Sequence, residues 1–299
     1  MRDDTARAIA EIGIPISPEM IAASQDLYQT RHETEPYRDA IVTRDERYGS
    51  HERQRLDVFQ PAGGGGKRPV LIFVHGGGFV AGDKRVGNTA YYDNVGVWAV
   101  RNGYVGVTMT YRLAPENVYP AGAADVGGAV KWATENIASF GGDPERIVLF
   151  GQSAGSTHVA TYGARPELHA RSGGGVRAIA MLSGVYDFTL HAHLEVARNA
   201  RAYLGGAPNA AAAGSALPAI ATAGIPLLFG ISEFDPPMFH EQAKALTDAI
   251  FAHTNRFPNV LFLPRHNHIS QIAHLNAGTD DRLLADRLTE FINVNTNML

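Results

Sequence analysis

The sequence predicts an α/β protein with a mainly parallel sheet that is flanked by helices. Short, unbroken apolar segments alternate with helical patterns over most of the chain. Strands that are apolar throughout belong to sheets buried on both faces, as in βαβ architectures. The chain has 299 residues, of which 45% are hydrophobic and 19% charged, so it has enough apolar residues for a large core.

The N-terminal part is predicted to be helical and then extended. Ser17-Pro18-Glu19 has the pattern of an N-cap followed by proline at the first helical position, which predicts a helix over 19–30. Residues 55–59 alternate polar and apolar side chains, as a strand does. A proline/glycine turn at 61–66 separates them from the apolar segment 68–75, and the two segments are expected to form a hairpin.

The rest of the chain alternates between the two element types. Strands are predicted at 68–75, 104–112, 146–151, 177–184, 225–232 and 260–264, and helices at 122–138, 154–164, 239–253 and near 280–293. The alanine/glycine run at 205–214 is interpreted as a flexible connection, and 187–222 as a segment above the sheet. We expect one domain over 1–299, with a small helical cap from 1–45 and part of 187–222.

The strongest functional signal is Gly151-Gln152-Ser153-Ala154-Gly155, which ends one predicted strand and opens the next helix. At such a sharp turn the serine sits in a strained conformation, and small residues on both sides let strand and helix approach. Ser153 would then project from the carboxyl end of the sheet, where α/β proteins bind ligands. A glycine-rich turn whose serine only caps the helix is the structural alternative.

A second glycine-rich segment, His75-Gly76-Gly77-Gly78-Phe79, follows the strand at 68–74. Consecutive glycines allow several backbone N–H groups to point at one oxygen, as an oxyanion hole requires. Alone, the segment is equally well explained as a flexible loop. Together with the turn at Ser153 it predicts acyl-transfer chemistry, and His75 is expected to be structural because it precedes the turn.

A nucleophilic serine requires a base, and the base requires an acid that orients it. Asp235 comes directly after the predicted strand 225–232, with Glu233 and Asp187 as alternatives for the acid. His268 follows the strand 260–264, with His266 as the alternative base. The order serine, acid, histidine along the chain is the one expected for a nucleophile on this kind of turn.

Composition excludes several other classes of function. The net charge of -4 and the lack of any basic run argue against nucleic acid as a partner, and no segment is apolar enough to span a membrane. The chain contains no cysteine, and its charged N-terminus does not resemble a secretory signal, so a cytoplasmic protein is expected. His191 and His193 have no third ligand nearby in the sequence, and we expect neither metal nor organic cofactor.

The chain resembles the hormone-sensitive-lipase-like branch of the α/β-hydrolases over roughly residues 55–295. The resemblance rests on the His75-Gly76-Gly77-Gly78 loop, the turn at Ser153, and the runs Tyr111-Arg112-Leu113-Ala114-Pro115-Glu116 and Asp143-Pro144-Glu145-Arg146-Ile147. It implies a triad of Ser153, Asp235 and His268. It also implies an oxyanion hole formed by the amides of Gly77, Gly78 and Ala154.

The chain departs from that family at two positions that flank the expected site. Phe79 stands where tryptophan is common, and Gln152 where many relatives have aspartate. Both residues are therefore expected to contact the substrate. The predicted activity is a carboxylesterase for short- to medium-chain esters, aryl esters among them, acting on a small molecule. An arylformamidase or amidase with the same triad, a non-catalytic ligand receptor on this fold, and a homodimer all stay open.

Overall fold

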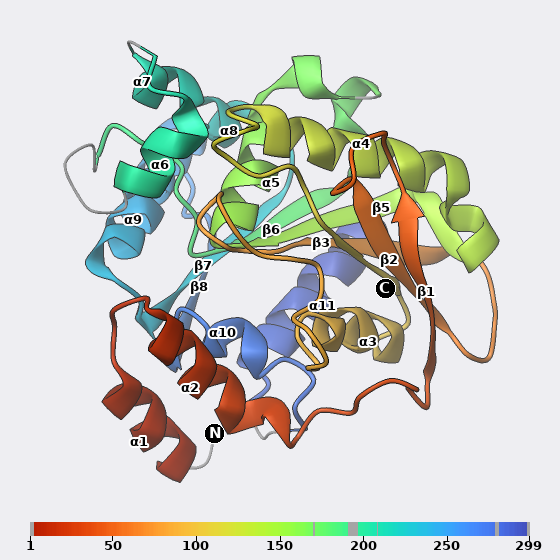
Figure 1. The fold of residues 1–299 in the computed structure, drawn as a ribbon. Coiled ribbons are helices and arrows are strands. Elements are labelled where there is room, and N and C mark those ends of the chain that lie inside the picture. The colour runs from red at the N-terminus through yellow and green to blue at the C-terminus, as the bar shows by residue number, and fades with distance from the viewer. Residues whose placement is uncertain (1–2, 170, 191–196, 208, 279–280, 298–299) are drawn as a thin grey trace.

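A mixed sheet runs through the centre of the protein in the order β1-β2-β4-β3-β5-β6-β7-β8 (Figure 1). The computed structural model describes residues 3–169, 171–190, 197–207, 209–278 and 281–297. The strands are β1 (Ala40–Arg47), β2 (Arg55–Pro61), β3 (Arg68–Val74), β4 (Val105–Met109), β5 (Gly142–Gln152), β6 (Ala178–Leu182), β7 (Leu227–Phe234) and β8 (Asn259–Asn267). β1 and β2 are antiparallel to their neighbours, and β4 through β8 pair in parallel.

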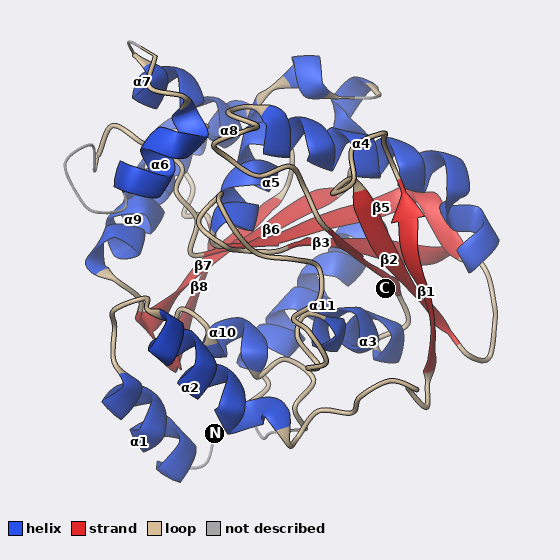
Figure 2. Ribbon diagram, in the orientation of Figure 1, coloured by secondary structure: helices blue, strands red, loops and turns tan. Residues whose placement is uncertain are grey.

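Helices cover both faces of this sheet (Figure 2). One face packs against α4 (Ala121–Asn136), α5 (Ala154–Ala164), α8 (Ala219–Thr222) and α9 (Pro237–Thr254). The opposite face packs against α3 (Asp93–Arg101), α10 (Ser270–Ala273) and α11 (Leu283–Thr296). The central strands are buried on both sides, which is why they are apolar throughout. The predicted fold class is confirmed.

The remaining helices lie near the carboxyl ends of the parallel strands. α1 (Asp3–Ile12) and α2 (Pro18–Gln29) lie beside β8 and α10, and α6 (Ala197–Leu204) and α7 (Ala210–Gly214) lie farther along the same rim. The predicted N-cap is confirmed, since the Ser17 side chain accepts a hydrogen bond from the Met20 amide. Short 3-10 turns complete the chain at Ile137–Phe140, Pro166–Leu168 and Ser172–Gly175.

Three local predictions require correction. The strand at 55–61 does not form a hairpin with 68–74, because β2 pairs with β1 and β4 while β3 pairs with β4 and β5. Residues 40–45 belong to β1, so any N-terminal cap ends before Ala40. The run 205–214 is not wholly a connection, because α7 occupies its second half, where alanine favours helix.

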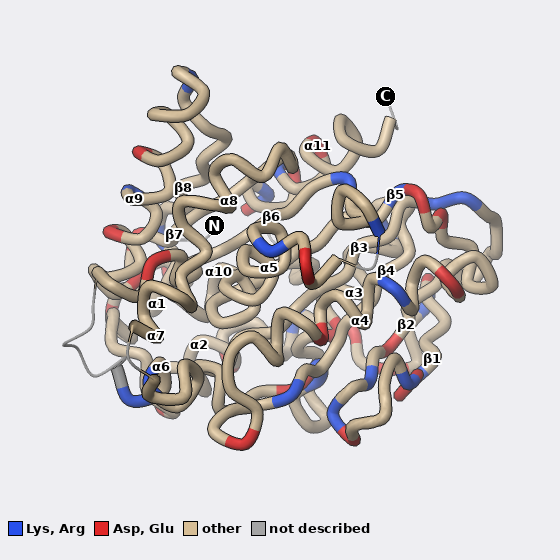
Figure 3. The backbone as a smooth tube through the Cα atoms, turned by 90° about the horizontal axis from the view of Figure 1, so that it is seen from above, with Lys and Arg blue, Asp and Glu red and all other residues tan. Residues whose placement is uncertain are grey.

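The charged residues of β1 explain why this strand was not predicted from the pattern of apolar residues. Arg44 lies 2.8 Å from Asp57 and 2.6 Å from Asp93, two carboxylates with fully buried side chains. Lys84 lies 3.2 Å from Asp57 on the other side. Acidic and basic residues are correspondingly interspersed around β1 and β2 (Figure 3). These ion pairs hold the antiparallel edge to α3 and the loop before it, so polar residues occupy positions that apolar patterning would assign to a core.

The two runs that carried the family resemblance besides the glycine loop and the serine turn prove to be structural. The Arg112 side chain and its backbone amide both bond to the buried carboxylate of Asp125 in α4, at 2.7–3.1 Å. Arg146 donates to Asp143 at 2.9 Å at the start of β5. Among the described residues, no helix is both long and apolar enough to cross a membrane.

Candidate active site

Ser153 stands alone between the end of β5 and the start of α5, with φ 56° and ψ -124°. A non-glycine residue pays for such backbone angles, so the neighbours must hold it there. A Cβ added to Gly155 would lie 2.0 Å from the carbonyl oxygen of Val74, so only glycine fits at that crossing. The Ser153 amide also donates to the carbonyl of Leu182 at 2.8 Å. The strained turn thus presents a partly exposed serine at the carboxyl edge of the sheet.

His268 and Asp235 come together from the ends of β8 and β7. His268 Nδ1 lies 2.7 Å from Asp235 Oδ1, and both residues are 2% exposed. Because a carboxylate only accepts, Nδ1 carries the proton and Nε2 carries the lone pair. Nε2 has no hydrogen-bond partner in the described part of the chain, and His268 lines the same cavity as Ser153.

The Asp235 carboxylate is held in place by two further donors. Its Oδ2 accepts from the backbone amide of Ser232 at 2.6 Å and from the hydroxyl of Ser183 at 2.7 Å. Ser183 directly follows β6 and has a φ of 52°, and its hydroxyl is also 3.1 Å from Gln271 Oε1. Three bonds to one buried carboxylate fix the direction in which it faces His268.

The loop that carries His268, called the histidine loop below, is held by two hydrogen bonds and one ring contact. The His268 carbonyl accepts from Gln152 Nε2 at 3.0 Å and from Gln271 Nε2 at 2.9 Å. Phe239 of α9 stacks on the imidazole with ring centroids 4.5 Å apart. Gln152 also lines the cavity, and its side-chain amide is engaged with the histidine loop.

Sequence reasoning missed Ser183, Gln271 and Phe239 as members of this arrangement. Asp235 was selected because it directly follows a parallel strand. Ser183 could have been selected for the same reason, since it follows the carboxyl end of β6. No pattern in the sequence indicated a role for Gln271 or Phe239 at this site. Their roles depend on how α10 and α9 pack beside β8 and β7, which no local pattern specifies.

The alternative acids and base lie elsewhere. Asp187 Oδ1 accepts from the amide and hydroxyl of Thr189, and Glu233 accepts from the Arg265 amide at 2.7 Å. His266 Nε2 lies 3.2 Å from Asp281. None of these three alternatives lines the cavity at Ser153 within the described chain.

The glycine loop after β3 bends back on itself above Ser153. Gly77, Gly78 and Phe79 have φ values of 131°, 60° and 72°, so each lies in the left-handed half of backbone space. A Cβ on Gly77 would meet the Ala81 carbonyl oxygen at 2.0 Å. The amides of Gly77, Gly78 and Ala154 bond to no group among the described residues, which leaves them available to an oxygen in the cavity.

His75 anchors this loop from inside the fold. Its Nδ1 donates to the Gly76 carbonyl at 2.5 Å, and its ring stacks on Tyr111 at 4.4 Å. Burial lowers the pKa of His75 to about 3, so the ring is neutral at physiological pH. Its enclosed position agrees with the structural role expected from the sequence.

Phe79 forms part of the cavity wall and of an aromatic cluster behind it. Its ring stacks on Tyr203 of α6 at 4.2 Å and meets the edge of His158 at 5.5 Å. Phe79 is only 4% exposed. The residue therefore links the glycine loop to α6, a connection that the sequence did not reveal.

Ser153 opens into a cavity of about 790 Å³. Its walls are mostly apolar: Pro15 and Ile16 come from the connection between α1 and α2, Ile21 comes from α2, and Val185, Met238 and Phe239 also line the cavity. The volume falls in the range of small-molecule sites. Residues of the N-terminal segment therefore form part of the cavity wall.

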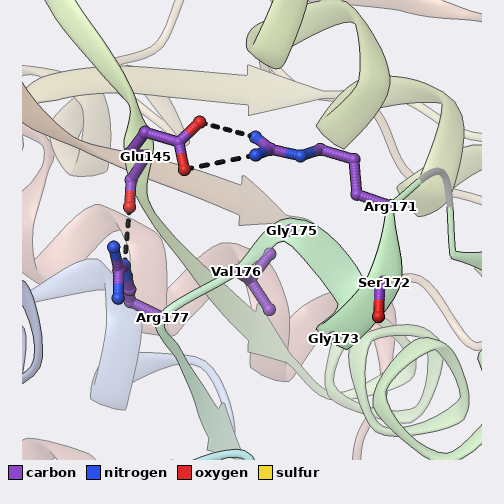
Figure 4. A pocket seen from close by; sticks show the side chains of 7 residues that line it. All are labelled: Glu145, Arg171, Ser172, Gly173, Gly175, Val176 and Arg177. Atoms are coloured by element: carbon purple, nitrogen blue, oxygen red, sulfur yellow. Dashed lines mark hydrogen bonds and ion pairs between the residues drawn. The ribbon is translucent and has the colours of Figure 1, made fainter.

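A second cavity lies away from Ser153, lined by Glu145, Arg171 and the glycine turn beside them (Figure 4). Arg171 forms two bonds with Glu145 at 2.8 and 3.2 Å, and Arg177 donates to the Glu145 carbonyl. The charged groups of this cavity therefore form hydrogen bonds and ion pairs with one another. In the described chain, the residues able to hold a metal are His266, His274 and Asp281, while His191 and His193 lie outside the described residues.

Comparison with known proteins places the chain among hydrolases. The BD-FAE family model matches residues 56–250. A phenmedipham hydrolase from Pseudarthrobacter oxydans is 37% identical over 120 residues, which are 37% of this chain and 23% of that enzyme. The chain spans about a quarter of the length of the curated relatives it matches.

Solved structures agree over nearly the whole chain. Esterase B from Lactobacillus rhamnosis has a TM-score of 0.74 at 18% identity and covers 93% of this chain and 94% of its own. An esterase of the bacterial hormone-sensitive lipase family has a TM-score of 0.72 at 22% identity, covering 98% and 97%. These likenesses confirm the predicted α/β-hydrolase fold.

Proposed function

Because the chain belongs to the BD-FAE family of α/β-hydrolases, we propose that it is a serine carboxylesterase acting on short- to medium-chain esters, aryl esters among them. The observation that carries this proposal is the buried pair of His268 and Asp235, 2.7 Å apart, together with the cavity that both His268 and Ser153 line. That arrangement supplies a nucleophile, its base and an orienting acid in one place.

In the proposed reaction, Ser153 Oγ attacks the ester carbonyl while His268 Nε2 takes its proton. Asp235 keeps the proton of Nδ1 in place and stabilises the imidazolium that forms. His268 then gives the proton to the departing alkoxide, which leaves as the alcohol and creates the acyl-enzyme. A water molecule, deprotonated by the same nitrogen, attacks the acyl carbonyl and releases the carboxylic acid and free Ser153.

The negative oxygen of each tetrahedral intermediate is proposed to lie among the amides of Gly77, Gly78 and Ala154. Their lack of other acceptors in the described chain supports this role. Ala154 is also the first residue of α5, so the positive end of the helix dipole adds to the attraction. One donor of such a hole contributes about 3–4 kcal/mol to lowering the barrier.

The cavity favours compact, apolar substrates. Its walls provide contacts for an acyl chain on either side of Ser153, and each buried methylene contributes about 0.8 kcal/mol until the chain meets the end wall. Phe79, stacked on Tyr203, is a rigid part of that wall. We therefore expect acyl groups of about two to six carbons to be preferred.

A panel of matched substrates tests the proposed activity. p-Nitrophenyl esters, the corresponding anilides, and N-formyl anilines are compared by kcat/KM with the same purified protein. Esters are expected to be turned over fastest. Faster turnover of N-formyl anilines would identify an arylformamidase with the same three residues, and turnover of none would favour a ligand receptor. A cytoplasmic location and a homodimer stay predictions of the sequence.

A further inference from the structure

Three potential metal ligands converge behind the histidine loop. His266 comes from β8, His274 follows α10, and Asp281 precedes α11. One ligand atom of each lies within 4.8 Å of the other two. Both histidines are buried, at 0% and 2% exposed, and the Asp281 side chain is 15% exposed. None of the three residues lines the cavity at Ser153.

His274 presents an unused lone pair to this cluster. Its Nδ1 lies 2.9 Å from the carbonyl oxygen of Ser270, which can only accept, so Nδ1 carries the proton. Nε2 is buried and has no hydrogen-bond partner among the described residues. A buried acceptor without a donor costs free energy, and a cation at that position would remove the cost.

His266 and Asp281 complete a donor set of two imidazoles and one carboxylate. His266 Nε2 lies 3.2 Å from Asp281 Oδ2, and its Nδ1 lies 3.0 Å from the hydroxyl of Ser270. Ser270 therefore orients both rings, one through its hydroxyl and the other through its carbonyl, as outer-shell partners of metal ligands do.

We propose that His266, His274 and Asp281 bind one divalent transition-metal ion, with Zn²⁺ as the preferred ion. Imidazole and carboxylate ligands suit zinc, and two ligands about 2.0–2.1 Å from a tetrahedral zinc lie about 3.3–3.4 Å apart. The spacing of 3.2 Å between His266 and Asp281 matches that edge. On binding, the proton of His266 resides on Nδ1 and is donated to Ser270, while water supplies the fourth ligand.

Such an ion would join parts of the chain that are far apart in sequence. It would tie β8 to the segment after α10 and to the start of the segment leading into α11. Tyr28 of α2 packs near the cluster, with its ring 6.4 Å from that of His274, and its hydroxyl is buried without a described partner. His266 is two residues from His268, so the ion would stiffen the histidine loop without taking part in the reaction. The site stands independently of the role proposed for Ser153.

Metal binding to the full chain tests this proposal. The protein is stripped with a chelator, transferred to metal-free buffer and titrated with Zn²⁺ by calorimetry, with Tm measured in parallel. The wild-type chain is expected to bind one equivalent and to gain Tm. His274→Gln and Asp281→Asn, which keep side-chain volume, should weaken binding at least about tenfold, and Ser270→Ala by about 10–100-fold.

Two controls separate this site from other histidines. His253→Ala removes an exposed histidine of α9 and should leave both affinity and stoichiometry unchanged. His268→Ala should also still bind one equivalent. The proposal is overturned if the folded wild-type chain takes up no stoichiometric Zn²⁺, or if His274→Gln and Asp281→Asn bind it as tightly as wild type. Loss of binding in His268→Ala alone would also overturn it.

Discussion

His268 Nδ1 and Asp235 Oδ1 lie 2.7 Å apart at the carboxyl ends of two neighbouring parallel strands. The pairing settles which of the three candidate acids faces the imidazole, because Asp187 and Glu233 are bound to other groups. The pair is buried, so water does not compete for either partner. The orientation of His268 therefore depends on Asp235.

Exchanging the two aspartates for asparagine tests this dependence. Asp235→Asn removes the acceptor that fixes the imidazole tautomer, and the same change in a serine-protease triad lowers kcat by about 10⁴-fold. We expect a loss of that order in ester hydrolysis at neutral pH. Asp187→Asn, the matched control, should keep kcat within about tenfold of wild type. The reverse ranking of the two variants would show that Asp187 is the acid.

Ser183 is expected to position Asp235 without touching the substrate. Its hydroxyl donates to Asp235 Oδ2 at 2.7 Å, and hydrogen bonds to charged groups contribute about 1.5–3 kcal/mol. Ser183→Ala should therefore lower kcat by about tenfold to a hundredfold, with KM little changed. Ser183→Thr, which keeps the hydroxyl, should restore part of the loss. Equal kcat in wild type and Ser183→Ala would contradict the role of Ser183 in positioning Asp235.

The neutral histidines of the core predict a loss of stability in acid. Burial lowers the pKa of His158 to about 3, against 6.5 for an exposed histidine. Below pH 6.5 the unfolded chain takes up a proton at this residue that the folded chain does not, so stability falls until about pH 3. Each such group contributes a slope of about 1.4 kcal/mol per pH unit.

Replacing His158 measures its contribution to the dependence of the unfolding free energy on pH. His158 packs among Phe79, Tyr111 and Tyr203, so phenylalanine suits the site in shape and polarity. Denaturant unfolding between pH 4 and pH 6 should show a slope for His158→Phe that is smaller than that of wild type by about 1.4 kcal/mol per pH unit. Parallel stability curves for the two proteins would contradict the neutral, buried state of His158.

The acyl-chain profile tests the shape of the cavity. kcat/KM for p-nitrophenyl esters should rise from two carbons, reach its maximum by about six, and then fall once the acyl chain reaches the cavity walls, to which Ile21 and Met238 contribute. Widening either wall, with Ile21→Ala or Met238→Ala, should move the maximum to longer chains on the side that holds the acyl group. A continued rise to sixteen carbons, with activation at an oil–water interface, would indicate a lipase.

Much of the fold and of the candidate site followed from local patterns. Unbroken apolar runs predicted the strands from β3 to β8, and alternating polar and apolar residues predicted β2. The strand-to-helix context singled out Ser153, and the ends of β7 and β8 indicated Asp235 and His268. These signals depend on residues adjacent in sequence, which is why a single chain sufficed.

The remaining features depend on contacts between distant segments. β1 was missed because its charged residues, among them Arg44, which pairs with carboxylates of β2 and α3, make the segment more polar than a buried strand usually is. Ser183, Gln271 and Phe239 act on the histidine loop from three different elements. The cluster of His266, His274 and Asp281 needs the path from α10 to α11, which the spacing of its residues did not indicate.

Covalent labelling of Ser153 by a fluorophosphonate tests the central claim most directly. The intact protein should gain the mass of one phosphonyl group, located by peptide mapping on Ser153, with loss of esterase activity in proportion. Ser153→Ala should fold normally, resist labelling and lose about 10⁶-fold in kcat, as removal of the serine does in a comparable triad. A label on another residue, or undiminished turnover by purified Ser153→Ala, would contradict the account.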